Sequence, residues 1–91
     1  MNFIKVHIIV EGLVQGIGYR YFVKKLAGKY NLSGYVRNNS DGSVEIETEI
    51  EKDILNNFIE ELKTGHPWAE VKSIKIKEYP YSGEFLDFKI I

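Results

Sequence analysis

Three glycines and one arginine fall within the nine residues 12–20, GLVQGIGYR, between an apolar strand-like run and an amphipathic helix. Glycine adopts positive φ without a Cβ clash, so successive backbone N–H groups can turn inward and form an anion-binding concavity. The free N–H groups and the dipole at the start of the following helix also favour an anion. Arg20 adds a planar, permanently charged group whose donors match two phosphate oxygens. The pattern therefore predicts a site for a phosphoryl group.

The same segment has a simpler, steric explanation. Turns between a strand and a helix use glycine for its backbone freedom, and most surface arginines are only solvated. Three glycines together with Arg20 at the predicted helix entrance favour anion binding over that explanation. Two better-known phosphate loops are excluded: the Gly-Lys-Ser/Thr ending of nucleotide triphosphatases is absent, and Tyr21 stands where the dinucleotide fingerprint needs its third glycine.

The composition predicts one domain spanning residues 1–91, with 44% apolar residues to form its core. Twelve Lys and Arg nearly balance thirteen Asp and Glu, so the chain has no overall attraction for nucleic acid or an acidic membrane. The absence of cysteine excludes disulfides, thiolate metal sites and a cysteine nucleophile. The longest apolar run contains Lys5 and His7 and fits neither a signal peptide nor a membrane span. We expect a soluble, cytoplasmic monomer without nucleic-acid or membrane partners.

Hydrophobic periodicity predicts the elements that position the glycine-rich segment. The predicted helices are residues 20–32 and 52–64. The predicted strands are residues 3–10, 34–38 and 43–50, a strand through Ile74 and Ile76, and a final strand through Leu86, Phe88 and Ile90. The first helix should end near Asn31, a residue that tolerates the left-handed conformation. Although the last two segments are both strand-like, we assign the order β-α-β-β-α-β, with four strands in the sheet. This predicts an α+β fold, the ferredoxin-like split β-α-β sandwich, in which a four-stranded, mostly antiparallel sheet carries two helices on one face.

In this topology the first two strands are parallel and the third lies between them. Their carboxyl ends then share one end of the sheet, which brings the glycine-rich segment within about 10 Å of Asn38. Asn38 has the parity of Val36, so its side chain should point toward the helices. Four carboxylates alternate with apolar residues on the third strand, and we expect them on a solvated sheet face: Glu45, Glu47, Glu49 and Glu51.

Two segments resemble the signatures of the acylphosphatase family. Residues 12–20 follow the pattern Gly-x-Val-Gln-Gly-Val-x-Phe/Tyr-Arg, with Ile17 in place of the usual valine. Residues 34–38, Gly-Tyr-Val-Arg-Asn, continue through Gly42 and Val44 with the expected spacing. The likeness covers essentially the whole chain. It departs from the family at Ile50, where glycine is usual, and at Asn39, where threonine is frequent.

The resemblance implies a ferredoxin-like hydrolase that splits the carboxyl-phosphate bond of acyl phosphates, releasing a carboxylate and inorganic phosphate. It implies that the backbone amides of the loop and the Arg20 guanidinium hold the phosphate, and that the Asn38 side chain orients the attacking water. Arg20 and Asn38 are then the catalytic residues. The implied phosphate-binding residues are Gln15, Gly16, Ile17, Gly18, Tyr19 and Arg20.

Other chemistries fit the sequence less well. No serine lies in a nucleophile elbow, and His7 and His66 lack the partners of a catalytic triad or a zinc site, so we expect no metal and no cofactor. The six tyrosines suggest an RNA-stacking surface, but the third strand presents glutamates instead of the basic-aromatic signature. Trp68 and Tyr81 fit either a hydrophobic pocket for the acyl part or ordinary loop packing.

The competing hypothesis is a catalytically silent ferredoxin-like module that binds a small anion or a protein partner for regulation, which the fold alone does not distinguish from an enzyme. Retention of both Arg20 and Asn38 favours the enzyme. No motif in the sequence indicates the physiological acyl group or the pathway.

Overall fold

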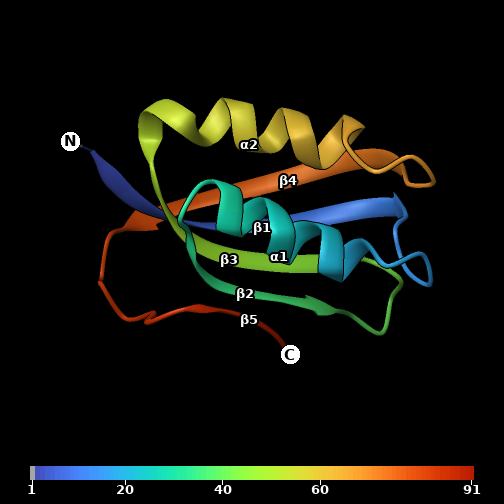
Figure 1. The fold of residues 1–91 in the computed structure, drawn as a ribbon, viewed down its shortest axis with the longest axis horizontal. Coiled ribbons are helices and arrows are strands. Elements are labelled where there is room, and N and C mark those ends of the chain that lie inside the picture. The colour runs from blue at the N-terminus through green and yellow to red at the C-terminus, as the bar shows by residue number, and fades with distance from the viewer. Residues whose placement is uncertain (1) are drawn as a thin grey trace.

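A five-stranded sheet with both helices on one face makes up the computed structural model, which describes residues 2–91 (Figure 1). The sheet is mixed, with three antiparallel pairings and one parallel pairing. The elements are β1 (Phe3–Leu13), α1 (Tyr19–Lys29), β2 (Ser33–Asn38), β3 (Val44–Glu51), α2 (Lys52–Thr64), β4 (Glu70–Pro80) and β5 (Phe88–Ile90).

The order of the strands across the sheet is β4-β1-β3-β2-β5. Because β3 is antiparallel to both of its neighbours, β1 and β2 are parallel to each other with β3 between them, as predicted. Val44 is the partner of Val10 on one side and of Asn38 on the other. The end of β2 is therefore level with Val10, three residues before the end of β1, at two strand spacings or about 10 Å.

The prediction of four strands in a mostly antiparallel sheet was wrong. β5 is a fifth strand, parallel to β2, with Gly34 opposite Phe88 and Val36 opposite Ile90. The chain leaves β4 at one edge of the sheet and crosses to the opposite edge, where Gly34 N donates to Asp87 O at 2.8 Å. The apolar alternation in the last residues indicates a strand, but it does not tell which edge the strand joins.

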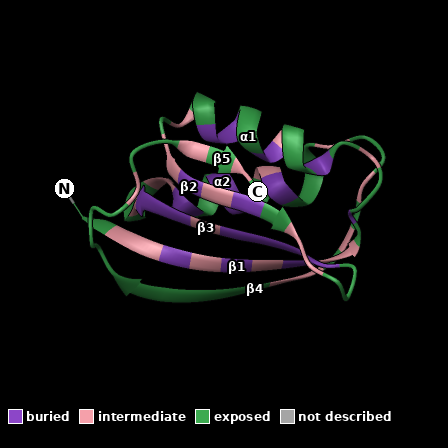
Figure 2. Ribbon diagram, turned by 90° about the horizontal axis from the view of Figure 1, so that it is seen from below, coloured by how far each residue is buried: buried purple, intermediate pink, exposed green. Residues whose placement is uncertain are grey.

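The core lies between the sheet and the two helices (Figure 2). Alternate residues of the central strands and one side of each helix are fully buried there, including Val6, Ile8, Val10, Val23, Val36, Val44, Ile46, Ile50, Phe58 and Leu62. These are the positions that the period-two and helical patterns predict. The helix α1 ends at Lys29, and Asn31 follows with φ of 55°, the left-handed conformation that the sequence predicts near this end.

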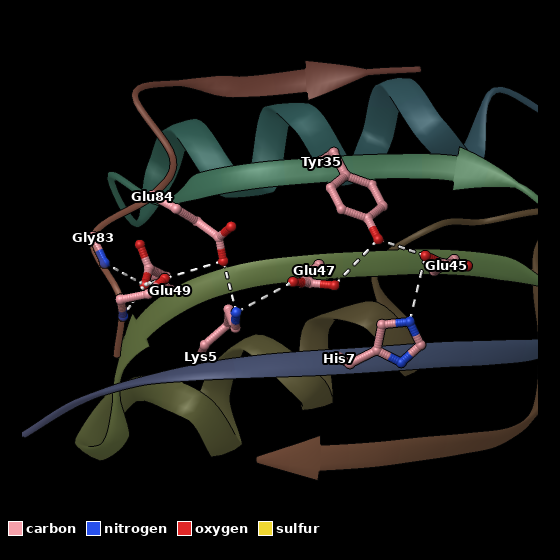
Figure 3. Close-up of polar contacts among 9 residues, drawn as sticks. Lys5, His7, Tyr35, Glu45, Glu47, Glu49, Gly83 and Glu84 are labelled. Carbon is pink, nitrogen blue, oxygen red and sulfur yellow. Dashed lines mark hydrogen bonds and ion pairs between the residues drawn. The ribbon is translucent and has the colours of Figure 1, made fainter. Parts of the chain in front are cut away.

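The opposite face of the sheet is less solvated than predicted. Only 7% of Glu45 is exposed, and its carboxylate accepts a hydrogen bond from the hydroxyl of Tyr35 at 2.5 Å (Figure 3). It accepts another from Arg37 at 3.1 Å. The ring of His7 lies 3.4 Å from the same carboxylate. Burial raises the pKa of Glu45, but the bonds from Tyr35, Arg37 and His7 outweigh it, so the pKa lies below the ordinary value.

Glu49 is also buried on this face, with 5% of its surface exposed. The segment 81–87 passes over it, and the backbone N–H groups of Ser82 and Gly83 donate to its carboxylate at 2.8 and 2.9 Å (Figure 3). Burial raises the pKa of Glu49 and these donors lower it further than burial raises it. The prediction of a solvated row of glutamates was wrong at Glu45 and Glu49. Tyr35, Arg37 and His7 surround Glu45, and the distant segment 81–87 covers Glu49.

Candidate active site

A cavity of about 520 Å³ opens at the end of the sheet where β1 and β2 finish and α1 begins. The connection from β1 to α1 and the connection from β2 to β3 lie side by side at this end (Figure 1). The cavity brings together the predicted loop, Arg20 and Asn38, although 18 residues separate the last two in the sequence. Its lining consists of Val14, Gln15, Gly16, Gly18, Tyr19, Arg20, Tyr21, Lys24, Asn38, Lys89 and Ile90.

The loop between β1 and α1 has the backbone conformation that its glycines predict. Gly16 and Gly18 have φ of 79° and 77°, and Gly18 caps the N-terminus of α1. A Cβ at either position would meet nothing within 4 Å, so the positive φ itself requires glycine there. Within residues 2–91, the backbone N–H groups of Gly16, Ile17 and Gly18 have no protein acceptor. These donors, with the first N–H groups of α1, are available to an anion.

Gly12 belongs to β1 and not to the anion-binding loop. It has φ of 132° and lies at a bulge in the pairing of β1 with β4. A Cβ at this position would come within 2.0 Å of Glu70 O, so the backbone of the adjacent strand requires glycine. The first of the three glycines is thus explained by strand packing, and the other two by the loop.

Three of the predicted phosphate-binding residues use their side chains for structure. The Gln15 amide nitrogen donates to Asn39 O at 2.9 Å and to Ser43 O at 2.8 Å. Ile17 packs against the core. Tyr19 is 1% exposed, its hydroxyl donates to Leu62 O at 2.7 Å, and burial raises its pKa, so the hydroxyl stays protonated. These residues can contact an anion only through their backbone N–H groups.

Arg20 is the exposed cation in the first turn of α1. Across residues 2–91, no Asp or Glu forms an ion pair with it. No acidic residue lies in the first turn of α1 either. Because no carboxylate occupies its guanidinium, the donors of Arg20 are free for a phosphate at the helix N-terminus.

Asn38 ends β2 with its side chain in the cavity, on the helix side of the sheet as its parity with Val36 predicts. Its side-chain oxygen is buried and has no hydrogen-bond partner. Buried polar oxygens nearly always have a hydrogen-bond partner, so we expect a water or a ligand group to bind this atom. Because Asn38 lines the cavity, its amide oxygen is suited to hold a water molecule by its hydrogen.

The cavity is positively charged although the chain as a whole carries a net charge of -1. Arg20, Lys24 and Lys89 line it, and among the described residues no Asp or Glu does. Neither lysine was predicted from the sequence. The spacing of four residues from Arg20 to Lys24 is a signal that could have found the first. Lys89 is in β5, whose pairing with β2 has no local signal in the sequence.

The two aromatic residues considered for the acyl group lie outside this cavity. Trp68 is 74% exposed and packs beside His66, with ring centroids 6.1 Å apart. Tyr81 packs on Phe3, at the opposite end of β1 from the loop, with ring centroids 5.8 Å apart. In the described part of the chain, no group of three or more potential metal-ligating His, Cys, Asp or Glu residues occurs.

Comparison with known proteins gives one consistent result. The acylphosphatase family model matches residues 6–90. An acylphosphatase of Treponema denticola is 45% identical over 84 residues, which cover 92% of this chain and 88% of that protein. The crystal structure of an acylphosphatase from Bacillus subtilis superposes with a TM-score of 0.91 at 40% identity, over 97% of this chain and 98% of that one. Full-length HypF, in a phosphate- and nucleotide-bound form, contains a similar segment: TM-score 0.88, 37% identity, 99% of this chain and 12% of that one.

Proposed function

This chain belongs to the acylphosphatase family, hydrolases of acyl phosphates, and we propose that Arg20, Asn38 and the backbone N–H groups of residues 15–20 carry out the hydrolysis. The observation that supports these roles is a single cavity lined by the loop, Arg20 and Asn38. The loop has unpaired backbone N–H donors, the Arg20 guanidinium has no carboxylate partner, and the buried amide oxygen of Asn38 is unpaired. Donors for the phosphate and an acceptor for water are the two things the reaction needs.

In this proposal the loop and Arg20 hold the phosphoryl oxygens. An acyl phosphate is an activated mixed anhydride, so its hydrolysis needs neither a covalent nucleophile nor a strong acid. Preorganised N–H donors and a guanidinium stabilise the charge on the phosphoryl oxygens as the bond to the carboxylate breaks. The donors are fixed by the glycine conformations and by the start of α1, so little reorganisation accompanies the reaction.

Asn38 orients the attacking water. Its free side-chain oxygen accepts a hydrogen bond from the water, which directs the water oxygen toward phosphorus, opposite the departing carboxylate. The end of β2 lies about 10 Å across the sheet from Val10 in β1. The Arg20 side chain and a bound phosphate span that gap between the two walls of the cavity.

The direct test is turnover of benzoyl phosphate, a simple aromatic acyl phosphate, by the purified protein in the presence of a chelator. We expect release of benzoate and phosphate at an undiminished rate, because the proposed catalysis uses no metal. Activity that disappears with the chelator and returns with magnesium would contradict the metal-free mechanism. Phosphate binding without any turnover would instead favour the catalytically silent, regulatory module.

The proposal also concerns the setting of the enzyme. Neither helix within residues 2–91 has the length and apolarity of a membrane span. A cytoplasmic monomer that acts on a small acyl phosphate, without nucleic acid, agrees with the balanced charge of the chain. Light scattering of the purified protein, with and without phosphate, measures the oligomeric state.

A further inference from the structure

The side chain of Gln15 joins the loop between β1 and α1 to the connection between β2 and β3. Its amide nitrogen donates one hydrogen bond to Asn39 O at 2.9 Å and another to Ser43 O at 2.8 Å. A glutamine amide group has two N–H donors, so both are used. Within residues 2–91, no other hydrogen bond connects the loop 14–18 to residues 38–43. Gln15 is therefore the direct polar link between the loop 14–18, here called the phosphate loop, and residues 38–43, here called the hairpin.

The hairpin that Gln15 holds is itself well braced. Asn39 N donates to Ser43 O at 2.9 Å, and Gly42 N donates to Asn39 O at 3.2 Å. Asp41 accepts from the backbone N–H of Ser43 at 2.9 Å and from its hydroxyl at 2.6 Å. These bonds make the turn a unit, so a displacement of the Asn39 carbonyl also displaces its neighbour Asn38.

Asn38 and the phosphate loop need this link because they come from different strands. The loop follows β1 and Asn38 ends β2, with β3 between these strands. Pairing with β3 fixes the backbone of each strand, including that of Asn38, but it does not fix the loop 14–18 or the turn 39–43 that begins directly after Asn38. A misplacement of about 1 Å between a bound substrate and a catalytic group can lower a rate a hundredfold. The Gln15 amide spans the distance over which such a shift would occur.

We propose that Gln15 is a positioning residue, whose side chain sets the position of Asn38 and its water relative to the phosphate held by the loop. This inference rests on the proposed function. Both side-chain donors of Gln15 are occupied by the hairpin, so its contribution to phosphate binding comes from the backbone N–H alone. The role differs from that of Arg20, which lines the cavity and has no carboxylate partner among residues 2–91.

The test compares Gln15→Met with the unsubstituted protein, because methionine has a similar length and no donor. We expect kcat for benzoyl phosphate to fall about tenfold to a hundredfold, while the inhibition constant of inorganic phosphate changes less than about threefold. Retained phosphate inhibition also shows that the variant is folded. Gln15→Glu, which places carboxylate oxygens against two carbonyl oxygens, should lose at least as much kcat. Asn57→Met, an amide removal on the exposed side of α2, is the matched control and should leave both constants unchanged.

A double-mutant cycle identifies the route of the effect. If Gln15 acts through Asn38, Gln15→Met should lower kcat no further once Asn38→Ala is present. An unchanged kcat in Gln15→Met, a parallel loss of phosphate affinity, or full additivity with Asn38→Ala would each overturn the positioning role while leaving the proposed function intact. Absence of turnover in the unsubstituted protein would overturn the proposed function, and the positioning role with it.

Discussion

We propose different roles for Arg20 and Asn38, although both line the same cavity. In the proposed mechanism, Arg20 contacts the phosphoryl oxygens in the ground state and in the transition state. Its replacement by alanine should therefore weaken inhibition by phosphate and lower kcat/KM for benzoyl phosphate about a hundredfold to a thousandfold, so that activity nearly disappears. Arg20→Lys should recover only part of the loss, because an ammonium replaces the two-pronged guanidinium with a point charge. Near-normal hydrolysis by folded Arg20→Ala would exclude the proposed role.

Asn38→Ala should separate binding from turnover. The loop donors and Arg20 remain, so phosphate inhibition should change little, while kcat falls about a hundredfold or more because the water is no longer oriented. Steady-state kinetics with phosphate as a competitive inhibitor measures both quantities in one set of experiments. A rise in the inhibition constant equal to the loss of kcat would instead make Asn38 a phosphate ligand.

At this scale the sequence predicts the residues of the site better than their individual roles. The glycines at 16 and 18, together with Arg20, identify the loop because their backbone and charge requirements are local. The hydrogen bonds of the Gln15 side chain could not be predicted from the sequence, because its acceptors are backbone carbonyls 24 and 28 residues away. Burial of Glu49 depends likewise on a distant segment.

The helix α1 holds the loop and Arg20 at its N-terminal end, so its stability can be changed without touching the site. Gly28 lies in its last turn, and a Cβ there would meet nothing within 4 Å. Gly28→Ala should raise the free energy of unfolding by about 0.5 to 1 kcal/mol, because alanine loses less backbone freedom on forming a helix. Urea denaturation measures the change, and kcat/KM should be unaffected. Destabilisation would mean that the helix terminus requires glycine for another reason.

In β2, a substitution of glycine by alanine should have the opposite effect on stability, and it serves as a control for the Gly28→Ala measurement. Gly34 has φ of 146°, and a Cβ there would come within 1.9 Å of Glu47 O on β3. Gly34→Ala should lower the free energy of unfolding by more than about 2 kcal/mol, because the pairing that holds Asn38 level with β1 must shift. Equal stability of the two alanine variants would contradict this account of the glycines.

Elements were predicted nearly to their observed ends where periodicity is strong, as in α2 at residues 52–64. The strand β5 has only three residues and pairs with a strand about fifty residues earlier, so its parallel position had no local signature. Gly12 was assigned to the loop because a bulge next to an edge strand and a turn use the same residue type.

The molecule as a whole should lose stability in acid through the carboxylates of the helix-free sheet face. The pKa values of Glu45 and Glu49 are lowered, since hydrogen bonds to their charged forms outweigh burial. Their contribution to folding is complete above the ordinary carboxyl pKa of 4.5 and is lost as the pH falls through the lower folded values. Urea unfolding between about pH 7 and pH 3 should show this decline, and Glu49→Gln should reduce its slope. An unchanged slope would exclude Glu49 from the acid transition.

For the whole molecule, the proposed mechanism depends on where a phosphate binds. The most direct measurement is a crystal structure of the protein with inorganic phosphate. We predict phosphate oxygens about 3 Å from the N–H groups of Gly16, Ile17 and Gly18 and from the Arg20 guanidinium, with a water on the Asn38 side-chain oxygen facing phosphorus. Phosphate bound away from this loop, or loop N–H groups that point out of the cavity, would contradict it.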